Sequence, residues 1–145
     1  MLAAAIDHLR ARLTLTYDTV LADIPEGPGR DEVALDVLWG LFTGELFHTS
    51  LELWIAGRTD PALAEKLVPV ELALDDVSRR LCQDLFPDLA ATTRFDQIIT
   101  LIISSIRGLA LLEIIQPSGR SVATRWPQIR EELLLSIERH RPSGG

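Results

Sequence analysis

The chain has 145 residues, of which 47% are hydrophobic and 24% charged, so it can bury one sizeable core without disulfides or a metal. The net charge of −7, with a single lysine, argues against this chain binding a nucleic-acid backbone unaided. Cys82 is the only cysteine, which excludes an intramolecular disulfide and suits a reducing cytoplasm.

Neither the first residues of the chain nor its most apolar window has the features of a targeting or membrane segment. The first residues lack a basic region and soon run into charged side chains, so they do not resemble a signal peptide. The most apolar window, 98–115, contains Arg107, Glu113, two serines and a glycine, which suits a buried helix better than a membrane span. We therefore expect a cytoplasmic protein without membrane contact.

Apolar residues recur at steps of three or four, without strand alternation or an internal repeat, and predict a single all-α domain over residues 1–145 with about five long helices. The first helix covers 1–24 and ends at a loop rich in proline and glycine. The second, 31–56, is apolar on nearly every side, so other helices should surround it. Its polar exceptions form one stripe, facing either solvent or a polar patch of a cavity: Glu45, His48, Thr49 and Glu52.

A tight joint separates the 31–56 helix from the next one, 60–86. Gly57 can take the left-handed conformation that ends a helix, while Asp60 can cap the following helix and Pro61 suits its first position. Pro69 should kink that helix, because its ring removes a hydrogen bond and crowds the preceding turn.

The last two helices, 93–116 and 124–141, are expected to form a dimer interface. The first is apolar on most faces, and since core packing uses only one face, another should meet a partner. Ser104 and Gly108 leave a shallow groove, for which we favour a subunit contact, although a neighbour in the same chain would also explain it. We expect a homodimer around a two-fold axis, with these candidate interface residues: Ile102, Ser104, Ser105, Gly108, Leu109, Leu112, Ile129, Leu133 and Ile137.

Three groups of residues resemble, in order and spacing, the ligand-binding domain of TetR/AcrR-family transcriptional regulators. They are Leu51-Glu-Leu-Trp54 with Arg58-Thr-Asp-Pro61, Ile106-Arg-Gly-Leu-Ala110, and Trp126-Pro127. The resemblance covers essentially the whole chain and implies a connecting helix over 1–24, a central helix over 31–56, a kinked helix over 60–86 and two dimerisation helices. It also implies a small apolar effector and no catalytic residues or cofactor.

The family's N-terminal helix-turn-helix unit is missing from this sequence, which opens inside what resembles the connecting helix. We expect either a fragment of a longer regulator, which this opening favours, or a natural remnant. Operator DNA would be bound by a full-length regulator, and the resemblance assigns no nucleic-acid contact to this chain alone.

We place a candidate ligand site between the 31–56 helix and its neighbours, because the many aromatic residues of this helix fill space stiffly and should leave gaps against the helix kinked at Pro69. A ligand cavity is typically apolar with a few convergent polar groups. For the aromatic residues, packing in the core is the alternative, and for His48 it is a hydrogen bond at the edge of the core. The candidate walls and polar anchors are Trp39, Phe42, Glu45, Phe47, His48 and Trp54.

Other chemistry has weaker signals. Glu45 and His48 match one Glu-x-x-His step of di-iron bundles, but such sites need a second copy and the sequence has none, so we predict no metal site. Phosphate loops and nucleophile motifs are also missing, so we predict no enzyme. Arg107 should pair with a carboxylate or carbonyl groups, because an unpaired buried charge is costly.

Two functions remain open at this point. The first is an effector-binding and dimerisation domain of a TetR-like regulator. The second is a helical homodimer that acts as an interaction module without a small-molecule ligand. A cavity lined by aromatic residues of the 31–56 helix would separate them.

Overall fold

The computed structural model describes residues 2–115 and 120–143, and all its regular structure there is helical, as predicted. Predictions for residues 1, 116–119 and 144–145, among them the expected last residue of the 93–116 helix, lie outside the described residues. The helices are α1 (Leu2–Ala22), α2 (Arg30–Phe42), α3 (Glu45–Gly57), α4 (Pro61–Leu85), α5 (Pro87–Ala90), α6 (Phe95–Ile115) and α7 (Arg120–His140).

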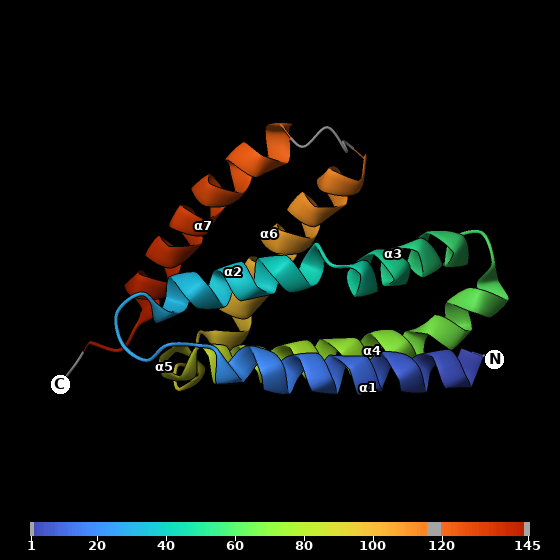
Figure 1. The fold of residues 1–145 in the computed structure, drawn as a ribbon, viewed down its shortest axis with the longest axis horizontal. Helices are drawn as coiled ribbons and strands as arrows, with labels where there is room; N and C mark the ends of the chain where they lie inside the picture. The colour runs from blue at the N-terminus through green and yellow to red at the C-terminus, as the bar shows by residue number, and fades with distance from the viewer. Residues whose placement is uncertain (1, 116–119, 144–145) are drawn as a thin grey trace.

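The helices form two groups that meet through α2 and α3 (Figure 1). In one group, α2 packs against α6 and α7, which also pack against each other. In the other group, α4 packs against α1 and α3. Short helix α5 follows α4 and turns the chain toward α6.

The hydrophobic core is concentrated in the first group and the end of α4. Side chains that are fully enclosed include Leu35 and Leu38 of α2, Leu85 of α4, and Ile102 and Ile106 of α6. The other group is packed more thinly, because several large apolar side chains on α1, α3 and the first half of α4 remain exposed: Leu15, Leu53, Ile55, Val68 and Leu72.

The expected single helix over 31–56 is wrong, because α2 ends at Phe42 and α3 begins at Glu45. The Thr43 hydroxyl donates to the Trp39 carbonyl at 2.8 Å, and Gly44 takes an extended conformation. A Cβ on Gly44 would lie only 3.3 Å from the nearest carbonyl oxygen of α2, so a larger residue would crowd this turn. The continuous apolar pattern concealed the break, although a Thr-Gly pair is a recognisable breaker.

The joint before α4 is partly as predicted. The Asp60 side chain accepts a hydrogen bond from the Leu63 amide at 3.2 Å, and Pro61 opens the helix. Gly57, however, is not left-handed, since only Gly27 and Gly29 have positive φ in the described residues. Gly57 instead allows α3 and α4 to approach each other closely, because a Cβ at this position would lie only 3.1 Å from a methyl of Leu67.

Two prolines lie inside helices. Helix α4 continues through Pro69, and Figure 1 shows α4 changing direction in its N-terminal part, while the kink expected at Pro69 itself stays a prediction. Helix α7 begins at Arg120, earlier than the predicted residue 124, so Pro127 lies within the helix and not near its start.

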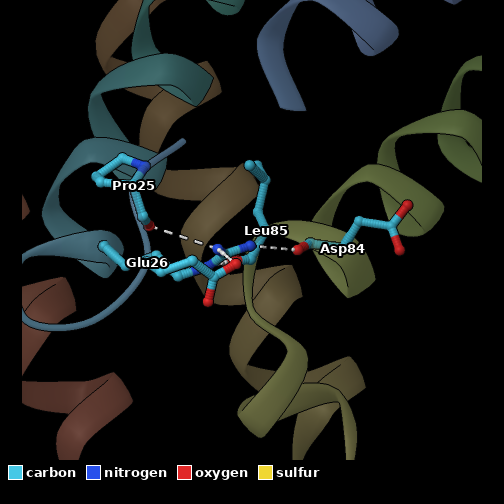
Figure 2. A network of polar contacts seen from close by, with 5 residues as sticks. Pro25, Glu26, Asp84 and Leu85 are labelled. Atoms are coloured by element: carbon cyan, nitrogen blue, oxygen red, sulfur yellow. Dashed lines mark hydrogen bonds and ion pairs between the residues drawn. The ribbon is translucent and has the colours of Figure 1, made fainter. Parts of the chain in front are cut away.

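Arg30 ties the loop after α1 to the end of α4, as Figure 2 shows. Its guanidinium donates to the Asp84 carbonyl at 3.0 Å and the Leu85 carbonyl at 3.3 Å, both among the last carbonyls of α4. It also reaches the Pro25 carbonyl and the Glu26 carboxylate. Carbonyls at a helix C-terminus lack partners within the helix, so a cation there is favourable.

Four candidate interface residues are buried within the chain itself: Ile102, Leu109, Leu133 and Ile137. They form part of the core between α2, α6 and α7, so they are not available to a second subunit in this structure, and their assignment to an interface is corrected. Periodicity identified an apolar helix face but could not say whether the same chain or a partner covers it.

Replacing Ile102 by alanine should lower the free energy of unfolding by about 2–5 kcal/mol, because it leaves a cavity in a close-packed core. The matched control is Leu135→Ala on α7, whose side chain is 54% exposed and which should change stability by less than about 0.5 kcal/mol. Urea unfolding followed by circular dichroism measures both. Equal effects of the two substitutions would contradict the core described here.

Candidate ligand cavity

A partly open cavity of about 490 Å³ lies where the two groups of helices meet. Its apolar walls come from five helices, and its volume falls within the range of small-molecule sites. Helices α2 and α3 supply Leu38, Leu41, Phe42, Phe47, Leu51 and Trp54, α4 supplies Leu74, Val77 and Leu81, and α6 supplies Leu111. Helix α1 closes one side with Arg12, Thr16 and Tyr17.

The break between α2 and α3 shapes the cavity directly. Phe42, at the end of α2, and Phe47, in the first turns of α3, meet edge to face with ring centroids 5.0 Å apart. Both rings line the cavity, so the change of helix at Gly44 lets one aromatic pair form its wall. Edge-to-face packing is a favourable arrangement of two aromatic rings.

Four of the six predicted ligand-site residues line the cavity: Phe42, Glu45, Phe47 and Trp54. Glu45 is exposed and the other residues of its polar stripe are not in the lining, so the stripe mainly faces solvent and only its first member reaches the cavity.

Trp39 does not line the cavity, and its assignment to the ligand site is corrected. Its ring stacks on Trp126 of α7, with centroids 4.8 Å apart and planes 9° from parallel. The Trp126 indole N–H donates to Asp36 at 3.0 Å, and Arg130 forms an ion pair with the same carboxylate at 2.7 Å. These aromatic and polar contacts hold α2 to α7.

His48 is also outside the cavity lining, so the sequence placed it there incorrectly. Its Nε2 atom is buried and has no hydrogen-bond partner among the described residues. The other expectation for His48, a hydrogen bond at the edge of the core, is therefore also not fulfilled at Nε2. One residue of helical rotation separates it from Phe47, which is enough to turn the side chain away.

Sequence reasoning expected gaps against the kinked helix α4, but it named none of the wall residues of α4 and did not expect a wall from α1. Tyr17, Leu74, Val77 and Ser78 lie on helices whose one-faced patterns are ordinary for core packing, so no local signal distinguished them. The Tyr17 hydroxyl also donates to the Asp84 carboxylate, which joins the cavity wall of α1 to the end of α4. These residues become neighbours only through tertiary packing.

Arg107 of α6 lines the cavity without the expected partner. Its Nε atom is buried and makes no hydrogen bond within the described residues, and the guanidinium carbon lies 5.6 Å above the centre of the Phe42 ring. A cation over an aromatic face is favourable, but it does not satisfy the N–H groups at the edge of the guanidinium. The predicted pairing with a carboxylate or carbonyls is therefore wrong in this structure.

Groups suited to other chemistry do not converge here. Among the described residues, no three histidine, cysteine or acidic side chains are grouped so as to hold a metal ion. A second hollow of about 710 Å³ lies near the loop after α1, and its charged side chains include Arg141 and Asp31, which already pair with each other.

One helical segment, Phe95–Glu113, is long and apolar enough to cross a membrane by length and composition. Within this structure 44% of that window is buried. Many of the apolar side chains of α6 are explained by the packing of this helix against α2 and α7.

Searches of protein-family models, of curated proteins and of solved structures found no match to this chain. The resemblance to the TetR/AcrR family stays a prediction, and the all-helical fold and the cavity stand on the structure alone.

Cys82 should be inert in the native protein. Its side chain, on α4, is fully enclosed, and burial raises the pKa of the thiol from 9.0 to about 12. We expect negligible reaction with a disulfide reagent such as DTNB at pH 8 in buffer and full reaction in urea. Because the native pKa is the higher one, this group's contribution to stability is complete below pH 9 and is lost as pH rises toward 12. Rapid labelling without denaturant would contradict this burial.

Proposed function

We propose that the chain binds a small, largely apolar molecule in the cavity between α1, α2, α3, α4 and α6. The observation that carries the proposal is the cavity itself, with a volume of about 490 Å³, mostly apolar walls and a few polar groups. In the TetR-like interpretation, this is the effector site of a transcriptional regulator that works in the cytoplasm. The function is binding, without catalysis or a cofactor.

The contribution of α1 to the cavity supports a regulatory role. In the TetR-like interpretation, α1 is the helix that connects the ligand-binding domain to a DNA-binding unit. Arg12, Thr16 and Tyr17 would contact a bound molecule, so the ligand would favour one placement of α1 over another. Such a population shift is how effector binding would alter the spacing of DNA-binding units in a full-length dimer on operator DNA.

We further propose that the outward face of α6 forms the homodimer contact. Leu101 is 48% exposed and Leu111 is 38% exposed, and the exposed Ser104 and Gly108 lie between them at helical spacing. A Cβ on Gly108 would meet no atom within 4 Å, and Gly108 and Leu111 also line the cavity, so this face of α6 borders the cavity at its C-terminal end. The half-buried candidates Ser105, Leu112 and Ile129 would lie at the edges of this face.

The same apolar face favours the second candidate function, a helical homodimer that is an interaction module without a ligand. The two candidates differ only in whether the cavity is used. Separate tests of the cavity and of the α6 face therefore distinguish them.

Filling the cavity should abolish binding of an apolar probe. Leu74→Trp places an indole among the cavity walls, whereas the control Leu72→Trp adds the same side chain at a 65% exposed position two residues away. Titration with the neutral fluorophore N-phenyl-1-naphthylamine should show saturable binding to the unmodified chain and to Leu72→Trp, and at least tenfold weaker binding to Leu74→Trp. Saturable binding that Leu74→Trp leaves unchanged would place the site elsewhere, and no binding would favour the interaction module.

A charge on the outward face of α6 should separate the subunits. Light scattering at micromolar concentration should give about twice the chain mass of 16.1 kDa, and Leu101→Glu should reduce this to one chain mass, because an unpaired carboxylate would enter an apolar contact. Leu72→Glu on α4 is the control and should remain dimeric. A monomeric unmodified chain, or a dimeric Leu101→Glu variant, would refute this interface.

A further inference from the structure

The cavity is lined by one charged side chain, Arg107, with a buried N–H group that lacks a hydrogen-bond acceptor in the described part of the chain. Arg107 comes from the most apolar helix, lines the cavity and has a buried Nε–H group without a hydrogen-bond acceptor among the described residues. An arginine remains charged in proteins and carries five N–H donors, so leaving a buried one unsatisfied is costly. Arg107 as a whole is half-buried, but its enclosed Nε–H is a donor of the kind that is ordinarily hydrogen-bonded, so an acceptor from outside the chain can fill this place.

The surroundings of Arg107 orient its free donors. The guanidinium lies over the Phe42 ring, with 5.6 Å between the guanidinium carbon and the ring centre. The N–H groups of a guanidinium lie in its plane, so an acceptor binds at its edge, where pairs of parallel N–H groups match the two oxygens of a carboxylate.

The acidic residues of the cavity do not supply that acceptor. Glu45 and Glu71 also line it, but neither forms an ion pair with Arg107. Glu45 is exposed to solvent and Glu71 is half-buried, so water is available to the first and partly to the second. Arg107 is the charged cavity residue whose buried atom lacks a partner.

We propose that Arg107 binds the carboxylate of an amphipathic ligand whose apolar part lies against the leucine, valine and aromatic walls of the cavity. This inference rests on the proposed function and narrows it from an apolar molecule to an apolar carboxylic acid. The carboxylate satisfies the edge of the guanidinium, and the hydrocarbon part displaces water from the walls of α3 and α4, chiefly Phe47, Trp54 and Leu74.

The test compares two probes that differ only in the polar group, octanoate and octan-1-ol, by isothermal titration calorimetry at pH 7.5. Both should bind the unmodified chain. Arg107→Met keeps an unbranched apolar side chain over Phe42 but removes the charge and the donors. It should weaken octanoate binding at least tenfold, equivalent to 1.4 kcal/mol, and change octan-1-ol binding less than twofold.

Two further variants keep the result interpretable. Arg107→Lys retains the charge as a single point donor and should weaken octanoate severalfold, less than Arg107→Met does, again without affecting octan-1-ol. Arg58→Met removes an exposed arginine that does not line the cavity, and should weaken octanoate less than twofold. Thermal melts establish that each variant is folded before titration.

Each other outcome overturns the inference. Unchanged octanoate binding in Arg107→Met, an equal or larger loss in Arg58→Met, or parallel loss of both probes in both Arg107 variants removes Arg107 as the carboxylate anchor. If octan-1-ol binds and octanoate does not, the inference fails while the proposed cavity function stands. If neither probe binds the unmodified chain, both fail.

Discussion

The break at Thr43 and Gly44 is the constraint on which the arrangement of this domain depends. It allows α2 to pack with α6 and α7 while α3 packs with α4, although the two helices are adjacent in the chain. A continuous helix would keep one axis and could not pack against both groups of helices. Phe42 and Phe47, on either side of the break, remain in contact and line the space that opens there. The cavity is thus a consequence of how a strongly apolar segment is divided between two packing partners.

The two groups of helices are stabilised differently. The α2–α6–α7 group holds most of the enclosed side chains, and burial of these is its main source of stability. Helix α1 is attached to α4 by contacts that include the Tyr17–Asp84 hydrogen bond, and the Arg30 contacts hold the loop behind it (Figure 2). Exposed polar contacts contribute little each. A helix held in this way can be repositioned at lower cost than one of the core, which suits the part proposed for α1 in transmitting ligand binding.

Different side chains of helix α6 face three different environments. Ile102 and Ile106 face the core, Arg107 faces the cavity, and Leu101 and Ser104 face outward. Gly108 and Leu111 both line the cavity and remain exposed, so a ligand and a second subunit would meet α6 at neighbouring positions. This proximity gives the proposed binding and dimerisation functions a common structural element, because a change at one surface alters the side chains that border the other.

Local sequence patterns determined the helical class, the cap at Asp60 and the start of α4 at Pro61, because hydrophobic periodicity and helix capping act between residues close in the chain. They also identified Phe42, Phe47 and Trp54, since aromatic residues on an apolar helix must pack against something. Only the tertiary structure decided that Trp39 stacks on Trp126, that Ile102 is covered by its own chain, and that Arg107 lacks an acceptor. Each of these depends on which distant helix covers a given face, and a helix face carries the same apolar pattern whether its partner is the core, a ligand or another subunit.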